Sequence, residues 1–109
     1  MSAKTITITD PVTSSQYVLE MNLDEVIKLE ERGVTQSTIA EKPIGAIYAI
    51  FVASFNKNAQ RVPINKRKEL FDIMIGDKLI DKLTDMYIDA MSAIADENEE
   101  GNAIWEANW

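Results

Sequence analysis

The side chains that could carry out acid–base chemistry in this sequence are carboxylates, because the chain contains neither histidine nor cysteine. Without these residues a serine nucleophile has no imidazole base, and zinc lacks its usual nitrogen and sulfur ligands. The glycines, Gly33, Gly45, Gly76 and Gly101, are too far apart to form a phosphate-binding loop. We therefore expect no enzymatic activity, no cofactor and no metal site.

An acidic run near the C-terminus partly matches a calcium-binding loop. Asp96, Asn98, Glu100 and Gly101 occupy the first, third, fifth and sixth positions of an EF-hand loop. The twelfth position, where such a loop needs a bidentate glutamate, holds Ala107. The run is therefore interpreted as a solvated stretch of charge rather than as a calcium site.

One local cluster of cations contains no acid. Its members are Lys57, Arg61, Lys66, Arg67 and Lys68. One interpretation is a contact for an acidic partner, or for the acidic tail of a neighbouring copy; the other is a solvated loop and helix start. Cations in the first turn of a helix oppose its dipole, which slightly favours a functional role. Nucleic acid is not an expected partner, because the net charge is −7 and no aromatic residue interleaves with the cluster.

The two tryptophans, Trp105 and Trp109, lie beyond the acidic run and the glycine that follows it. Tryptophan is enriched among the residues that dominate protein–protein binding energy. The two side chains either fold back onto the core of their own chain or form a segment that becomes ordered on a partner.

Residue patterning predicts a mainly α-helical fold, a small bundle of about four helices with an N-terminal β-hairpin over residues 5–21. The alternation in residues 5–9 and the apolar residues of 16–21 indicate two strands, and residues 10–15 supply turn chemistry. At 109 residues the chain has room for one domain. We expect a helical domain over residues 1–96 and an acidic, tryptophan-containing tail over residues 97–109.

Capping residues and apolar spacing locate the helices. Asn22 is expected to cap the first helix and Gly33 to end it, and residues 35–41 form a polar connector. Pro43 opens a central helix that is apolar on nearly every side. Asn65 is expected to cap the next helix and Asp77 the last, whose pattern breaks at residue 96.

Two further expectations concern the central helix. Its small residues Gly45, Ala49 and Ala53 fall four apart, which predicts a stripe that lets another helix approach closely. Its apolar run, residues 44–55, spans about twelve residues, whereas a membrane span needs roughly twenty. The N-terminus shows no signal segment and the chain no cysteine, so we expect a cytoplasmic protein without membrane association.

The order and spacing of several segments carry a family resemblance. These segments are Tyr-Val-Leu-Glu-Met-Asn at 17–22, Val-Ile-Lys-Leu-Glu at 26–30 followed by Gly33, Glu-Lys-Pro-Ile at 41–44, Phe-Val-Ala-Ser-Phe-Asn-Lys-Asn at 51–58 and Gly-Asn-Ala-Ile-Trp-Glu at 101–106. In this layout the chain resembles the small tail assembly chaperones of long-tailed, non-contractile bacteriophages and prophages of Gram-positive bacteria.

The resemblance implies a protein that coats the tape measure protein during tail assembly, keeps it soluble, helps to recruit tail tube subunits and is absent from the mature virion. It also implies a homo-oligomer in the host cytoplasm. Phe51, Phe55, Phe71 and Tyr87 are then expected to be core or groove-wall residues that bind the partner, with Trp105 and Trp109 contacting a neighbouring copy or a partner. Two alternatives are a structural tail or connector component and a small acidic secretion-type chaperone or adaptor.

Overall fold

The computed structural model describes the backbone of residues 4–101 and residue 108, and the side chains of residues 4–92 and 108. Among these residues the fold is mainly helical with an N-terminal antiparallel hairpin, which confirms the predicted fold class. The elements are β1 (Thr5–Thr9), β2 (Gln16–Glu20), α1 (Leu23–Glu31), α2 (Gln36–Glu41), α3 (Pro43–Ala53), α4 (Ile64–Met74) and α5 (Asp77–Gly101). The described part holds five helices rather than about four, because the polar connector forms α2.

The hairpin forms where the alternating sequence predicts it. The register pairs Thr5 with Glu20 and Thr9 with Gln16, so isoleucines of β1 lie opposite Tyr17 and Leu19 of β2 on the face turned toward the helices. The backbone N–H of Glu20 donates to the carbonyl of Ser54 at 3.0 Å, which joins β2 to the end of α3.

The turn between the two strands is organised by Asp10. Its carboxylate accepts the backbone N–H of Val12 at 2.8 Å, and its own backbone N–H donates to the carbonyl of Ser15 at 2.8 Å. Ser14 completes the turn in the left-handed region at φ 63°. This side-chain-to-backbone bonding is the reason that Asp favours turns.

The capping residues confirm the bounds of α1. The Asn22 side chain accepts the N–H of Glu25 at 3.0 Å, and Gly33 follows the helix at φ 86°, a conformation that suits glycine. A reciprocal capping box occurs instead at α2, where Thr35 and Thr38 each bond the other's backbone N–H.

Two predicted helix boundaries are wrong. Helix α4 begins at Ile64, directly after Pro63, so Asn65 lies inside its first turn and its side-chain oxygen accepts the neighbouring N–H of Lys66. Helix α5 continues through the acidic run to Gly101, beyond the break expected at residue 96. Glutamate is a good helix former, and intrinsic propensity continues the helix where the apolar pattern stops.

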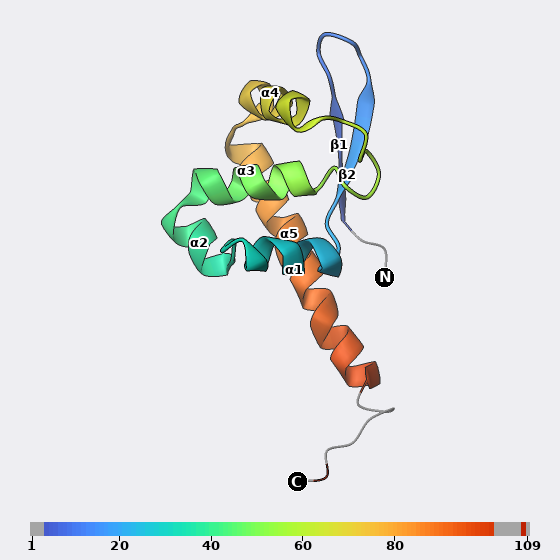
Figure 1. The fold of residues 1–109 in the computed structure, drawn as a ribbon, viewed down its shortest axis with the longest axis vertical. Coiled ribbons are helices and arrows are strands. Elements are labelled where there is room, and N and C mark those ends of the chain that lie inside the picture. The colour runs from blue at the N-terminus through green and yellow to red at the C-terminus, as the bar shows by residue number, and fades with distance from the viewer. Residues whose placement is uncertain (1–3, 102–107, 109) are drawn as a thin grey trace.

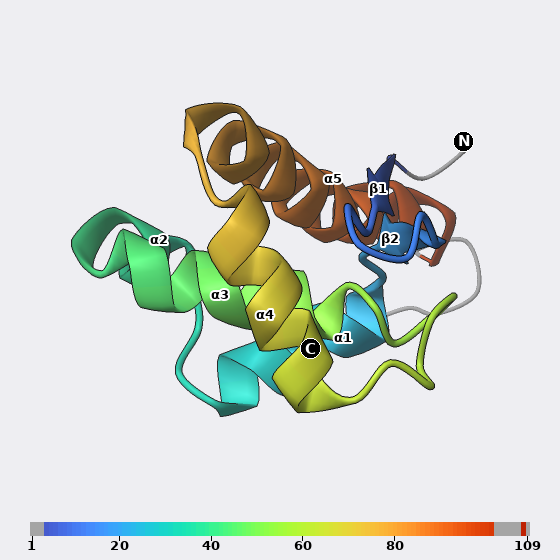
Figure 2. The same ribbon diagram turned by 90° about the horizontal axis from the view of Figure 1, so that it is seen from above.

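Helix α3 is the centre of the fold. It contacts α1, α2, α4 and α5, in agreement with its apolar composition. Figure 1 shows α4 on one side of α3 and α1 on the other, with α5 crossing behind them and extending past α1. Figure 2 shows the hairpin beside α5 and the loop that leads to α4. No helix in the described part of the chain is long and apolar enough to cross a membrane.

Candidate partner-binding cleft

The four aromatic residues predicted to bind a partner lie inside the core. Phe51, Phe55, Phe71 and Tyr87 are all almost completely buried. The Phe51 ring is 5.2 Å from the Phe55 centroid and 5.3 Å from that of Phe71, in edge or tilted geometry. Of the two expected roles, core and groove wall, the structure shows the core, and the partner-binding role is therefore corrected because these side chains have almost no exposed surface. Burial raises the pKa of the Tyr87 hydroxyl, with a further contribution from Glu30.

The predicted small-residue stripe is a close contact only at its last member. Gly45 is exposed, and a Cβ added there would meet nothing within 4 Å. Ala49 is half-buried, and Ala53 lies in the core. The helix-packing role predicted for Gly45 is therefore wrong, because this residue lies in the exposed first turn of α3.

The predicted basic patch does not form one surface. Lys57 pairs with Glu20, Lys66 pairs with Asp10 at 2.9 Å, and Lys68 pairs with Asp72 at 3.7 Å. Arg67 is buried, with 4% of its surface exposed. Arg61 is exposed, and none of the residues that the structure describes forms an ion pair with it. Most of these cations therefore bond to groups within the chain. Trp105 and Trp109 lie outside the described residues.

Asp10 and Lys66 connect the hairpin turn to α4. The carboxylate of Asp10 is fully buried by the surrounding side chains, and the Lys66 ammonium lies 2.9 Å from it. The bond from Lys66, followed by that from the Val12 N–H, lowers the pKa of Asp10 to about 2. The same contact raises the pKa of Lys66. Both groups are therefore charged at neutral pH.

Arg67 organises the region where α3 ends and α4 begins. Its Nε donates to the carbonyl of Val62 at 2.8 Å, and its Nη2 donates to that of Gln60 at 3.0 Å. Its Nη1 donates both to the carbonyl of Val52 at 2.7 Å and to Oδ1 of Asn56 at 2.8 Å. Burial lowers the pKa of the guanidinium, which at neutral pH still carries its charge.

The chain of polar contacts continues from Arg67 to α1. Asn56 donates from Nδ2 to Oε2 of Glu25 at 3.0 Å, and Lys28 lies 3.6 Å from the other oxygen of Glu25. Glu25, like Arg67, is buried. Each buried charge thus has polar partners, as a stable interior requires.

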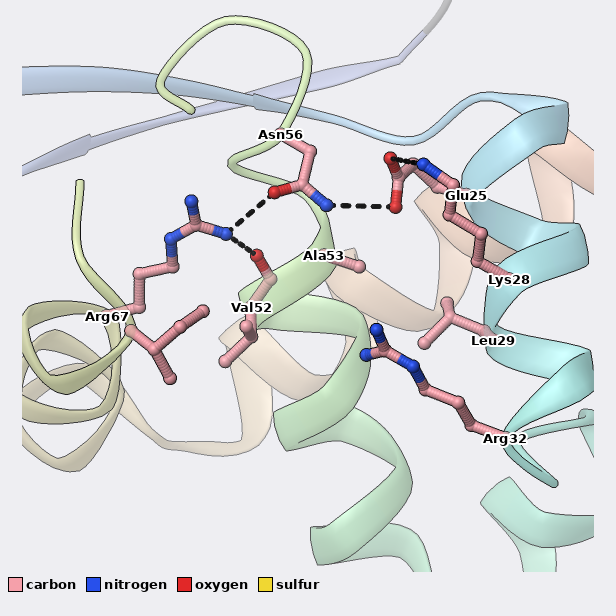
Figure 3. A pocket seen from close by; sticks show the side chains of 9 residues that line it. Glu25, Lys28, Leu29, Arg32, Val52, Ala53, Asn56 and Arg67 are labelled. Carbon is pink, nitrogen blue, oxygen red and sulfur yellow. Dashed lines mark hydrogen bonds and ion pairs between the residues drawn. The ribbon is translucent and has the colours of Figure 1, made fainter. Parts of the chain in front are cut away.

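These residues line a cleft of about 330 Å³ between α1, the end of α3 and α4 (Figure 3). The lining residues are Glu25, Lys28, Leu29, Arg32, Val52, Ala53, Asn56, Ile64 and Arg67. Figure 3 shows the Arg32 side chain extending from α1 toward α3 across this space. No residue in the described part of the chain forms an ion pair with Arg32, so its guanidinium is available to a carboxylate from outside.

The lining of the cleft combines one carboxylate with apolar and cationic side chains. Its single carboxylate, Glu25, is already engaged by Asn56 and Lys28. In the described residues no group of three or more carboxylates is placed to hold a metal ion. Ile64 and the half-buried Val52 supply apolar surface beside the nearly buried Leu29 and Ala53, while Lys28 and Arg32 supply positive charge. This lining suits an apolar side chain that is accompanied by a carboxylate.

The sequence patterns did not predict this cleft, although the position of Arg67 on its helix was an indication of a buried polar network. Positions 67, 70, 71 and 74 share one face of a helix, so the spacing places Arg67 on the same face as Leu70 and Phe71. A cation at a core position needs polar partners, and this requirement points to a buried network.

The described geometry defines a small helical protein with a hairpin and a charged binding cleft. Over residues 1–109 the chain matches the family described as a domain of unknown function (DUF5055), and it belongs to that family. No curated protein and no solved structure matches the chain.

Proposed function

We propose that this protein is a tail assembly chaperone of a long-tailed bacteriophage or prophage, which binds the tape measure protein, keeps it soluble and helps to recruit tail tube subunits. The observation that carries the proposal is the cleft between α1, α3 and α4, a preformed site suited to a helical segment of another protein. The resemblance of the segments at 17–22, 41–44, 51–58 and 101–106 supplies the identity of the partner.

The cleft fits a helical client by its chemistry. An amphipathic helix binds a groove through apolar side chains spaced three or four residues apart. At this site Leu29 and Ala53 lie at the base, and Ile64 stands at the edge with 56% of its surface exposed. Lys28 and Arg32 would select helices with an acidic residue beside the apolar one. The net charge of −7 disfavours nucleic acid as the client.

The proposed place of action is the host cytoplasm, before the virion is complete. Such a chaperone covers apolar client surface during assembly and leaves afterwards. Its absence from purified virions, measured by mass spectrometry, is the expected result. Stoichiometric presence in virions would instead support a structural tail or connector component.

The central experiment is co-expression with the tape measure protein encoded in the same genome, followed by pull-down and size-exclusion chromatography with light scattering. We expect a soluble complex that contains this chain. A tape measure protein that stays insoluble while this chain elutes alone would contradict the proposal.

Two residues on α4 provide a matched pair for locating the client site. Ile64 and Ile73 have 56% and 55% of their surfaces exposed, but only Ile64 lines the cleft. Ile64→Gln is expected to reduce the amount of client retained in solution, whereas Ile73→Gln leaves it unchanged. Equal effects of the two substitutions would remove the cleft from the proposal.

A further inference from the structure

We infer that the cleft also binds a second copy of this chain, through the solvent face of α5 centred on Ile88. This association builds on the homo-oligomer implied by the resemblance behind the proposed function, names the two surfaces that form it and is tested on the chain alone. It rests on three features of the described residues: the exposed face of α5, the lining of the cleft and the distribution of charge.

The solvent face of α5 presents one apolar side chain among acids. Asp81, Asp85 and Ile88 lie at spacings of four and three residues, so they share one face of the helix. Ile88 has 38% of its surface exposed, although Leu83 and Tyr87 on the opposite face are buried. Within the described part of the chain, no cation lies within ion-pair distance of Asp81 or Asp85.

The cleft presents the complementary arrangement. Lys28 and Arg32 lie four residues apart on α1, the same spacing as Asp81 and Asp85 on α5. Two helices lying side by side can therefore match two cations with two carboxylates. Ile88, one turn further along α5, then reaches the apolar surface of the cleft, which at about 330 Å³ accommodates a side chain of this size.

The charge is also unevenly distributed along the sequence, with an excess of acids toward the C-terminus. Residues 83–109 contain seven of the eighteen acids and none of the eleven bases, which leaves eleven acids and eleven bases in residues 1–82. Residues 83–109 thus carry a net charge of −7, equal to that of the whole chain. Figure 1 shows α5 extending beyond the other helices.

The contact is heterologous, because one copy contributes α5 and the other contributes the cleft between α1 and α4. Such contacts produce closed rings or open chains, depending on the rotation between copies. Since the attraction is between exposed charges, added salt weakens it. The molar mass of the protein is therefore expected to rise with concentration and to fall as salt is added.

A charge exchange tests the pairing directly by light scattering. Arg32→Glu and Asp85→Lys are each expected to raise the dissociation constant about ten-fold, because each replaces an attraction with a repulsion. In an equimolar mixture the intact cleft of the Asp85→Lys chain can bind the intact α5 face of the Arg32→Glu chain. The two substituted surfaces attract each other as well, so association between unlike copies is expected to recover. Arg61→Glu, outside the cleft, serves as the control for a change of net charge. Equal weakening by Arg61→Glu, or a monomer at every concentration, would overturn the inference.

The absence of cysteine permits a second, independent test. Arg32→Cys and Ile88→Cys are prepared separately, mixed and oxidised, and the products are separated by mass. We expect the mixed disulfide to exceed either symmetric dimer several-fold. The same experiment with Arg61→Cys in place of Arg32→Cys is expected to give no such excess. Statistical pairing in both mixtures would contradict the assigned surfaces, and unchanged circular dichroism of each variant would show that the fold is intact.

Discussion

Arg67 joins segments of the chain that are distant in sequence. Its guanidinium bonds three backbone carbonyls, at Val52, Gln60 and Val62, and the side chain of Asn56. It also lies 5.2 Å from the centre of the Phe55 ring. Arg67 is therefore one of the groups that hold the loop between α3 and α4, together with the backbone bonds of the loop itself, and the cleft depends on the position of that loop.

Replacement of Arg67 tests this arrangement. Arg67→Ala removes the donor of four hydrogen bonds in a partly buried region, and the loss of such a partner typically costs about 1–3 kcal/mol. We expect the free energy of unfolding in urea to fall by at least that amount. Arg61→Ala is the matched control, since substitution of an exposed residue usually changes stability by less than about 0.5 kcal/mol. Similar effects of the two substitutions would show that the Arg67 bonds do not hold the loop.

Asp10 makes a pH-dependent contribution at the hairpin turn. Its pKa is lowered from 3.8 to about 2 in the folded chain, first by the bond from Lys66 and then by that from the Val12 N–H. A group with a lowered folded pKa stabilises the fold above its unfolded pKa. That contribution is lost as the pH falls from about 4 toward 2.

The corresponding prediction compares the wild-type chain with Asp10→Asn. At neutral pH the variant is expected to melt at a lower temperature, because the ion pair with Lys66 is lost. Below about pH 2 the two melting temperatures converge, since Asp10 is then protonated in both states. Melting curves recorded by circular dichroism from pH 7 to pH 2 measure the difference. A constant difference across this range would contradict the assignment.

At the level of elements, two glycines have opposite roles. Gly33 ends α1 at φ 86°, a conformation that side chains rarely adopt. Gly45 lies inside α3, and a Cβ there would enter open space. Gly45→Ala is therefore expected to stabilise the protein by about 0.4–1 kcal/mol, and Gly33→Ala to destabilise it by more. Urea unfolding of both variants provides the measurement. Destabilisation by Gly45→Ala would instead support the close helix contact that was predicted from the spacing of the small residues.

Local sequence signals predicted the elements because those signals act over a few residues. The alternation in β1, the Asn22 cap, Gly33, Pro43 and the apolar spacing along α5 each match the structure. Helix α2 was expected as a polar connector that could hold a helical turn, because it contains few apolar residues. The reciprocal bonds of Thr35 and Thr38 stabilise its first turn.

The cleft was not predictable in the same way. Glu25 and Asn56 are 31 residues apart, and Arg67 and Val52 are 15 apart. The burial of Glu25 and Arg67 depends on these distant partners, which local sequence patterns do not identify. The aromatic residues show the converse, because Phe51 and Phe71 were identified as important but fill the core.

At the scale of the whole molecule, α5 makes the protein elongated. The radius of gyration is 15.6 Å, whereas a compact domain of this length has about 13 Å. Among the described side chains, the buried apolar residues extend from Ile8 to Ala90.

A truncation tests whether the C-terminal segment contributes to the core or to a partner. Removal of residues 101–109 deletes Trp105 and Trp109 but none of the described core. We expect the truncated chain to unfold cooperatively at nearly the wild-type melting temperature, while its yield of soluble tape measure complex decreases. Retained folding would show that the core does not require the tryptophans. A reduced yield of the complex would show that they contact a partner. If the cooperative transition disappears, the tryptophans contribute to the core. If both folding and complex yield are unchanged, the segment has no role in binding the client.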